Sequence, residues 1–451
     1  MEDVLVRIHR SRVLFLCLTW PAGLAYAQSE KPAAPAAQRA AWTPAALSEK
    51  IREEWKWLRL AGELRSRAEA PTAVSFLEGS NDFDVLTRIR LNALVTARPW
   101  LKFFGEWQDV RGLGYNPPVP GTIANRLDLR QAYVEVGAPE GTGWGVRLGR
   151  QALKFGKGRL VWDPDWANFG RSFDGVRVSV ADRGVRLDAF AASVLVARDR
   201  FFDRSDTSNM FYGLYGALAR WGRNLRVEPY LFVKSNAAAR NELGRMGALD
   251  LYTAGFRATG LWTETIDWEG EVAFQSGRFA AHPVGAVGGV WALGWQTGPR
   301  PWQPRLAAGY TYASGDHNPR DGRKGTFDTL YPTTHLRNGA TDRIGWANIH
   351  DVVIQGDWKP SRKLKLSAGG HDFRLATVRD ALYSPGGGAL VRNAQASSRH
   401  VGVELFVTAD YQLSRTLSLG AGCAHLFRGA FLRESGRGGA TQPYTFLTYR
   451  F

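Results

Sequence analysis

Apolar and polar residues alternate along much of this chain with a period of two. The clearest runs lie at 225–233, 266–274 and 401–411, and in the second of them residues such as Trp268 and Val272 alternate with acidic ones. Alternate side chains of a strand point to opposite faces, so each run has one apolar and one polar face. Each run is about ten residues long, which is the length that a tilted membrane strand needs. A half-buried soluble sheet would alternate too, but most of its strands would be shorter.

The last residues of the chain show the same alternation. Leu447, Tyr449 and Phe451 occupy alternate positions, with mostly polar residues between them. The closing strand of a bacterial outer-membrane barrel commonly ends in this way, because its aromatic side chains lie in the membrane interface. The alternative is an ordinary edge strand of a soluble sheet.

Connections of two lengths alternate between the predicted strands. Short turns such as 182–184 and 359–361 alternate with longer polar stretches, and this is typical of a barrel with periplasmic turns and extracellular loops. The count gives eighteen strands, an even number that places both termini in the periplasm. A barrel of that size encloses an aqueous channel. We therefore predict an all-β fold, a porin-like transmembrane antiparallel β-barrel of about 18 strands in the bacterial outer membrane. The longer stretches are expected near 70–84, 111–125, 155–172, 198–209, 236–249, 277–286, 314–342, 377–399 and 429–440.

Residues 1–27 have the pattern of a secretory signal peptide. Basic residues precede an apolar run from Val13 to Trp20, and a small-x-small cleavage pattern ends at Ala27. The run is too short to span a membrane as a helix. Cleavage there would leave Cys423 as the single cysteine, so the exported chain would form no intramolecular disulfide.

The predicted barrel follows a short lead-in. Residues 28–57 are rich in Ala, Pro and Gln and then become charged, and Thr43-Pro44 is a typical helix start. We interpret them as a periplasmic N-terminal segment. The barrel is expected to occupy residues 58–451.

The composition is basic and rich in aromatic residues. The formal net charge is +16, and the chain holds 17 Trp, 14 Tyr and 23 Phe. Aromatic residues favour strands and membrane-interface belts. An exported basic protein is not a nucleic-acid binder by default. The charge suits an acidic polymer, anionic lipopolysaccharide or both.

The parity of the strands predicts which basic residues face the channel. Arg or Lys on the lipid face at mid-membrane costs roughly 2–4 kcal/mol, so the channel face is favoured. The alternative place for each is the membrane rim, beside lipid phosphates. Arginine carries a permanent charge and a planar fork that matches carboxylates, so an arginine-rich channel predicts an anion path. The basic residues that this argument places in the channel are Arg88, Arg90, Lys102, Arg147, Arg177 and Arg305, with Arg186, Arg226, Arg257, Lys363 and Lys365 as further candidates.

Catalytic and metal chemistry are not predicted. The histidines are scattered, and no nucleophile motif such as Gly-x-Ser-x-Gly is present. His400 beside Ser398 is better explained by a contact at a loop end. A loose calcium-like spacing at 316–322 lacks the expected Glu and ligand ladder, so a polar turn is favoured. We expect no catalytic residue, no metal site and no cofactor.

Several motifs together are similar to those of one known family. The most distinctive segment contains Gly149-Arg150-Gln151, Gly156-Lys157-Gly158-Arg159-Leu160 and the run 170–177, in which Arg171, Asp174 and Arg177 lie. With the stretches at 315–328, 331–333, 344–351, 380–383, 397–404 and 447–451, it resembles the signature of the alginate-export (AlgE-like) outer-membrane proteins. The resemblance runs from about residue 58 to the end.

The resemblance implies an eighteen-stranded barrel whose electropositive, constricted pore passes a polyuronate exopolysaccharide outward. It also implies that Arg150, Arg159, Arg171 and Asp174 line or shape the constriction. The periodicity gives Arg150 the same parity as Leu148, which would face lipid. A bulge one residue earlier, or a strand end above the bilayer, would reconcile the two.

The leading functional hypothesis is passive export of an anionic polysaccharide such as alginate. Its further partners would be outer-membrane lipid or lipopolysaccharide and periplasmic polysaccharide-secretion proteins. A general or small-anion porin is the transport alternative. A barrel hydrolase or deacylase is the alternative of a different class. The sequence leaves the sugar open.

Overall fold

The computed structural model describes residues 43–114, 123–138, 142–219, 224–241, 243–298, 302–333, 335 and 337–451. The predicted signal peptide lies outside these residues. Helix α1 (Pro44–Glu54) begins where Thr43-Pro44 indicates a helix start, and the Thr43 hydroxyl accepts a hydrogen bond from the amide of Ala46. No helix among the described residues is long and apolar enough to cross a membrane.

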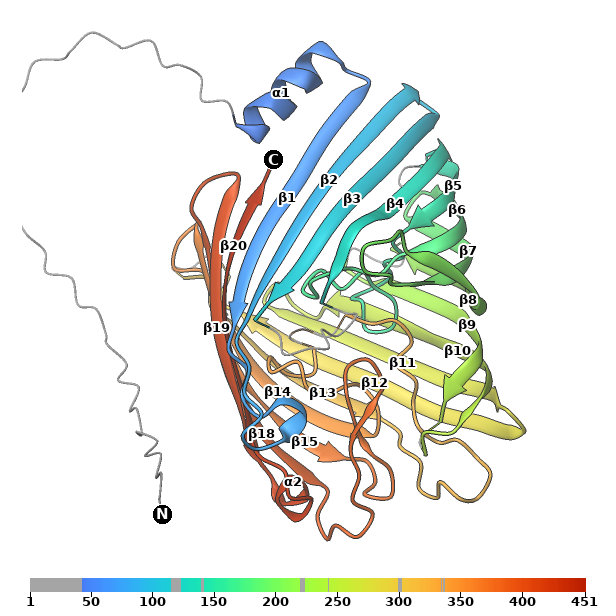
Figure 1. Ribbon diagram of the computed structural model, residues 1–451, viewed down its shortest axis with the longest axis vertical. Helices are drawn as coiled ribbons and strands as arrows, with labels where there is room; N and C mark the ends of the chain where they lie inside the picture. Colours follow the sequence, from blue (N-terminus) through green and yellow to red (C-terminus); the bar gives the residue numbers. More distant parts are fainter. Residues whose placement is uncertain are drawn as a thin grey trace, which may run out of the picture. The chain divides into compact units, whose positions relative to one another are not determined.

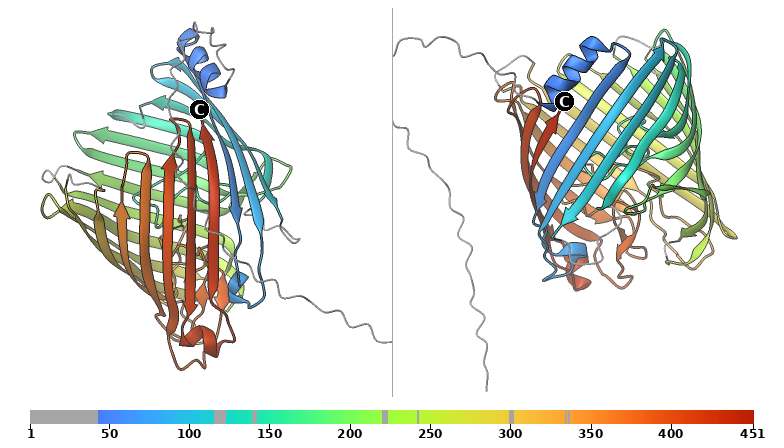
Figure 2. Two further views of the ribbon diagram at one scale, coloured as in Figure 1. Left: turned by 90° about the vertical axis from the view of Figure 1, so that its left-hand side faces the viewer. Right: turned by 45° about the horizontal axis from the view of Figure 1, so that its top comes forward.

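Eighteen antiparallel strands form one sheet that closes on itself (Figures 1 and 2). Small elements accompany it in the loops: the 3-10 helix η1 (Val74–Phe76), the hairpin β16 (Leu382–Tyr383) and β17 (Ala389–Val391), and helix α2 (Ala430–Glu434). The strands of the wall are β1 (Leu58–Glu69), β2 (Asp84–Arg98), β3 (Leu101–Leu113), β4 (Asn125–Gly137), β5 (Gly143–Gln151), β6 (Phe173–Asp182), β7 (Val185–Val196), β8 (Arg204–Leu218), β9 (Arg226–Arg240), β10 (Met246–Leu261), β11 (Ile266–Phe279), β12 (His282–Gln296), β13 (Arg305–Ala313), β14 (Ile349–Trp358), β15 (Leu364–Leu375), β18 (His400–Gln412), β19 (Leu417–Arg428) and β20 (Ala440–Arg450).

The first and last strands close the barrel. β1 pairs with β2 on one side and with β20 on the other, in register from Glu63 opposite Arg450 to Glu69 opposite Tyr444. Closure removes both sheet edges, so the ladder leaves no backbone edge facing lipid. The predicted antiparallel barrel of eighteen strands is confirmed.

The two faces of the wall differ as the alternation predicts. On β18, Leu405 and Val407 are 54% exposed on the outside, whereas Glu404, Phe406 and Thr408 are buried inside. Exposed apolar side chains alternate with buried polar ones along most of the ring, whereas β6 to β9 also turn aromatic side chains inward. The outer face is therefore apolar and the inner face carries the charge.

Exposed tryptophans gather at one end of the barrel. We name this the turn end, because short turns join the strands there and it carries the start of β1 and the end of β20. The opposite end is the loop end. Aromatic side chains of this kind anchor a barrel at the membrane interface. The tryptophans at or beside these turns are Trp100, Trp144, Trp262, Trp295 and Trp302, each more than half exposed.

Two of the expected long loops are strands instead. β9 and β10 are joined by residues 241–245, and β11 and β12 by 280–281 alone. The polar residues that suggested loops lie on paired strands, and Ser235 on β9 bonds to Asp250 on β10. A strand that continues beyond the hydrocarbon is polar on both faces, so its period-two signal disappears.

We expect Leu405→Arg, near the middle of β18 on the outer face, to lower the free energy of unfolding by about 2–4 kcal/mol. The same position changed to Ala stays apolar and should cost clearly less. Urea titration of the barrel refolded in lipid vesicles measures both. Equal costs for the two variants would show that this face does not contact lipid.

Candidate functional site

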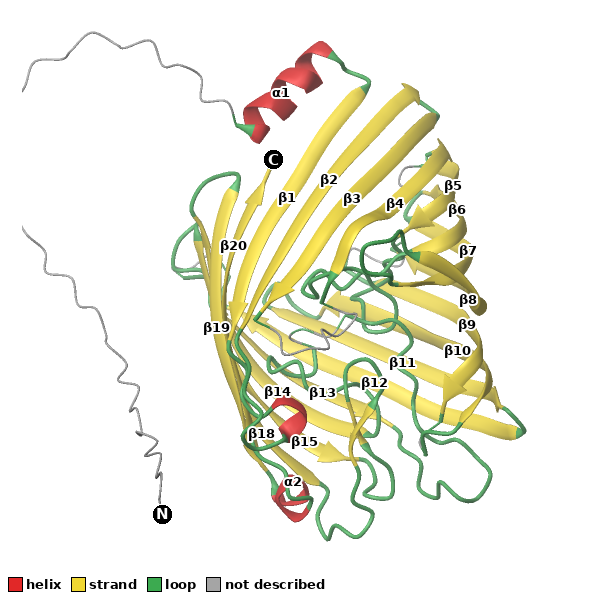
Figure 3. Ribbon diagram, in the orientation of Figure 1, coloured by secondary structure: helices red, strands yellow, loops and turns green. Residues whose placement is uncertain are grey.

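Two loops turn into the barrel instead of leaving it (Figure 3). They are the β5–β6 loop (residues 152–172) and the β13–β14 loop (residues 314–348). They meet at a parallel bridge between Val161 and Tyr331, where the amide of Tyr331 donates to the carbonyl of Leu160 at 2.8 Å. The two loops therefore form one unit across the lumen.

Aromatic packing fixes this unit to the wall formed by β6 to β9. Phe155 of the β5–β6 loop stacks on Phe190 and Tyr215, with ring centroids 5.5 and 4.7 Å apart. Tyr331 of the β13–β14 loop packs edge-on against Phe211 at 4.8 Å. These rings are buried, so the lumen on this side is filled with apolar side chains.

Arginines of β1 and β2 hold the tip of the β5–β6 loop from the other side. The Asp165 carboxylate lies 2.9 Å from Arg88 Nη2 and 3.2 Å from Arg90 Nη1. Arg65 donates to the carbonyls of Asp165, Trp166 and Ala167 at 2.8–3.2 Å. The Asp165 side chain is 55% exposed although it bridges two buried guanidinium groups. It is thus the water-facing member of the cluster.

A second carboxylate of this loop is buried. Asp163 pairs with Arg130 of β4, which also pairs with Glu106 of β3. Burial raises the pKa of Asp163, but the charges of Arg130 and Arg90 outweigh it and hold that pKa below its ordinary value. For Asp165 the balance is the same, and Arg88 and Arg90 keep its pKa well below the usual range. Both carboxylates are therefore ionised at neutral pH.

A third cluster joins the same loop to β11. Arg159 pairs with Glu269 and lies 3.2 Å from Glu271, and Arg257 of β10 donates to Glu269 at 3.1 Å. Lys157 lies 3.8 Å from Glu269 and is half exposed. Burial lowers the pKa of Lys157, and the neighbouring guanidinium groups lower it further against the pull of Glu269. Charge of both signs thus alternates across the constriction.

The β13–β14 loop has its own anchors on the wall. The buried Glu404 of β18 accepts hydrogen bonds from Ala340 and Thr341. His335 stacks on Trp166 with centroids 3.7 Å apart and pairs with Asp342 at 2.9 Å. The β13–β14 loop is therefore tied both to the wall and to the β5–β6 loop.

Four other basic residues predicted from the sequence lie in the wall, and each of these four has an acidic partner. Lys102 and Arg147 share Glu135, at 3.1 and 2.8 Å. Arg177 lies 2.9 Å from the buried Asp188. Arg305 lies 2.6 Å from Asp267 near the turn end.

Arg150 and Asp174 pair with each other near the loop end of β5 and β6. They face each other in register at 2.9 Å, and Arg150 also donates to the carbonyls of Leu129 and Asp203. These contacts join the ends of strands to a neighbouring loop, so the ion pair stabilises the rim of the wall. Arg171 lies with its guanidinium 5.3 Å from the ring centre of Tyr331.

A family model described as alginate export matches residues 56–447. The chain belongs to the alginate export family. Membership implies a polysaccharide substrate. It also agrees with the resemblance that the motifs between Gly149 and Arg177 indicate.

Solved structures with this fold are outer-membrane porins. Pseudomonas aeruginosa OccK11 (OpdR) is 13% identical with a TM-score of 0.57, over 87% of this chain and 96% of that chain. Acinetobacter baumannii OccAB1 is 11% identical with a TM-score of 0.58, over 87% and 96%. P. aeruginosa OccK2 (OpdF), solved in complex with glucuronate, is 12% identical with a TM-score of 0.57, over 87% and 96%. Among curated proteins, none matches the chain at a significant level.

Family and fold together identify an outer-membrane channel. The turn end of this alginate-export family barrel is then the periplasmic end, and the loop end faces outside. Within the described residues, no three His, Cys, Asp or Glu side chains are grouped so that they could hold a metal ion.

Several residues of the constriction were not found by sequence reasoning. Arg65 lies on β1 with the parity that identified Arg88 and Arg90, so the same alternation contained it. Arg130 sits where the register of β3 and β4 shifts, and a bulge disturbs parity. Asp163 and Asp165 lie in an irregular loop, for which periodicity carries no signal.

Asp165→Asn tests the role of the exposed carboxylate in this alginate-export family barrel. The backbone bonds to Arg65 and Arg88 remain and hold the loop, while one negative charge leaves the lumen. A unit charge at about 4 Å in water is worth about 1 kcal/mol, so the anion-to-cation permeability ratio should rise up to about five-fold. Reversal potentials in a KCl gradient measure it.

The matched control is Asp321→Asn, which removes the same charge from an exposed position of the β13–β14 loop. It should leave the ratio unchanged. An unchanged ratio in Asp165→Asn would mean that ions do not pass this carboxylate.

Proposed function

We propose that this barrel exports an anionic polysaccharide, alginate or a similar polyuronate, through the constriction between its two inward loops. The observation that carries the proposal is the set of lumenal guanidinium groups held around one half-exposed loop carboxylate. Arg88 and Arg90 both bind Asp165, and Arg65 stands beside them.

A uronate carboxylate has the same chemistry as the Asp165 side chain. Two adjacent guanidinium forks bind carboxylates in paired, charge-assisted hydrogen bonds. Because Asp165 is 55% exposed, its place on Arg88 and Arg90 is open to competition from the lumen. A passing sugar acid would exchange with it and then be released as the loop carboxylate returns.

Weakly held cations on the same loop would guide the chain between such exchanges. The Lys154 and Lys157 side chains are 47% and 50% exposed, and their closest carboxylates are 3.4 and 3.8 Å away. Acidic neighbours such as Glu269 lie between the basic side chains, so the positive charges do not form one continuous binding surface. This separation favours passage over tight retention, since a transported ion must be able to leave each site.

The fold supports a path for sugar acids. OccK2, a barrel of the same fold, was solved in complex with glucuronate. The family to which this chain belongs is that of alginate export. Transport would be passive, and polymer synthesis and periplasmic secretion proteins would supply its direction.

The test is block of single-channel current by a hexamer of mannuronate in planar bilayers. The wild-type barrel should prefer anions, and the hexamer should interrupt its current while neutral maltohexaose does not. Lys154→Gln with Lys157→Gln should shorten each interruption several-fold, because two weakly paired cations on the path are lost.

The matched control for this variant is Arg320→Gln with Arg323→Gln, which removes two exposed charges from the outer part of the β13–β14 loop. It should block like wild type. Cation selectivity, or equal block by the neutral oligomer, would refute the export proposal. Free passage of glucuronate together with no block by the hexamer would favour the small-anion porin.

A further inference from the structure

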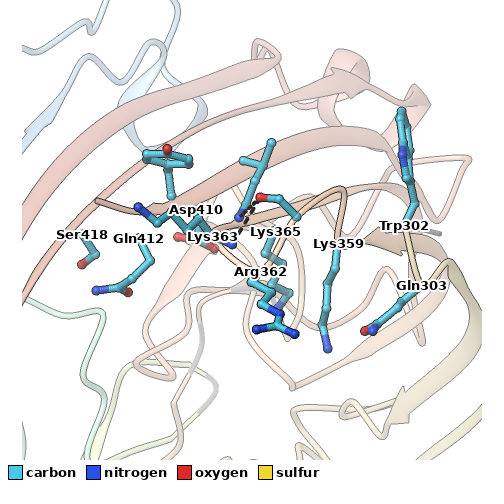
Figure 4. Close-up of a pocket in the computed structure, with 12 residues that line it drawn as sticks. Trp302, Gln303, Lys359, Arg362, Lys363, Lys365, Asp410, Gln412 and Ser418 are labelled. Carbon is cyan, nitrogen blue, oxygen red and sulfur yellow. Dashed lines mark hydrogen bonds between the residues drawn. The ribbon is translucent and has the colours of Figure 1, made fainter. Parts of the chain in front are cut away.

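A pocket of about 640 Å³ opens inside the periplasmic mouth of the barrel (Figure 4). Its side chains are those of Trp302 and Gln303, of the turn at 359–363 and of the ends of β15, β18 and β19. Lys365 of β15 stands opposite Asp410 of β18, and Gln412 stands opposite Ser418 of β19. These wall positions share the inward parity of Thr408, so the pocket faces the lumen.

Four basic side chains converge on this pocket. They are Lys359, Arg362, Lys363 and Lys365, and they lie within seven consecutive residues. Figure 4 shows Lys359 and Arg362 extending in the same direction, while Trp302 points away from them. Repulsion between neighbouring cations makes such a cluster costly unless an anion is close.

The cluster lacks the close carboxylate partners that Arg88 and Arg159 have deeper in the lumen. Among the described residues, no carboxylate lies within 4 Å of the Lys359, Arg362, Lys363 or Lys365 side-chain nitrogens, whereas Arg88 and Arg159 each contact two. The side-chain nitrogen of Lys363 donates to the carbonyl of Leu413 at 3.3 Å. Asp410 lies within electrostatic reach of Lys365 but forms no ion pair with it. The mouth pocket therefore gathers four positive charges that have no carboxylate in ion-pair contact among the described residues.

We infer that this mouth pocket captures the carboxylates of the acidic polysaccharide as it arrives from the periplasm. The inference rests on the proposed export function and adds the place where the polymer is first bound. Lys359, Arg362 and Lys365 would bind the carboxylates of successive sugar units. Gln303, Gln412 and Ser418 supply the amide and hydroxyl groups that hydrogen-bond sugar hydroxyls.

Size and position support a segment of polymer as the occupant. The volume lies in the range of pockets that take ligands of several rings, roughly 300–1,000 Å³. Asp410 at its inner side is within electrostatic reach of His335, which belongs to the β13–β14 loop. A chain bound in the pocket would therefore point at the constriction.

Electrostatic capture acts mainly on the rate of association. A cleft lined by one sign of charge raises the association rate of an oppositely charged ligand by about 10–10³-fold, and salt weakens the effect. The deeper guanidinium groups, by contrast, would determine how long the polymer stays. The two roles are separable in one measurement.

The experiment adds a mannuronate hexamer to one side of a single channel and then to the other. Each channel thus reports an association rate for both of its mouths. In wild type at low salt, the hexamer should associate several-fold faster at one mouth of the barrel than at the other. The variant Lys359→Gln, Arg362→Gln, Lys365→Gln should lose about ten-fold in the faster rate alone, with the length of each block unchanged.

The control variant removes three exposed basic residues from outer loops, Arg320→Gln, Arg323→Gln and Arg392→Gln, and it should keep the faster rate. Heat-modifiable migration checks that every variant folds. An unchanged faster rate in the mouth variant, with wild type still blocked, would overturn the capture site and leave the export function standing. No block of wild type from either side would overturn the export function itself.

Discussion

Lipid offers no hydrogen bond to a peptide group, and this constraint determines the whole architecture. Only a sheet that closes on itself satisfies every strand at membrane depth. Here closure depends on the ladder between β1 and β20. The side chains reinforce the seam, because Glu63 of β1 binds both Arg88 of β2 and Arg450 of β20. β1, which closes the barrel against β20, therefore also positions Arg88 in the constriction.

The inward loops follow from the charge that the closed wall encloses. Buried guanidinium groups are stable only with carboxylate or carbonyl partners. β1 and β2 supply more arginines than their own carboxylates can pair, and the β5–β6 loop brings Asp165 and three carbonyls to them. The same loop brings Asp163 to Arg130 of β4. The loop is thus held by the same groups that would contact a sugar acid. Structure and transport use one set of arginines.

Periodicity was enough to predict the barrel, its strand number and the inward face of Arg88, Arg90 and Lys102. These follow from local alternation, which lipid on one side and water on the other impose on every strand. The partners of these residues could not be predicted. Asp165 lies 77 residues after Arg88 in the sequence and reaches it because the β5–β6 loop folds back into the barrel. No local sequence pattern predicts this contact. The predicted lengths of β9 and β10 were too short, because both faces of these strands become polar where the strands leave the hydrocarbon.

The strands of the wall are unequal in length. β2, β8, β9 and β12 have 15 residues and β10 has 16, whereas β5 and β13 have 9. A tilted membrane strand needs about 9–11 residues, so five more extend the wall by about 17 Å along the strand. The exposed Arg240, Asp250 and Arg278 lie on this extension. The outer rim is therefore uneven, because the wall from β8 to β12 stands higher than β5 and β13 on its two flanks.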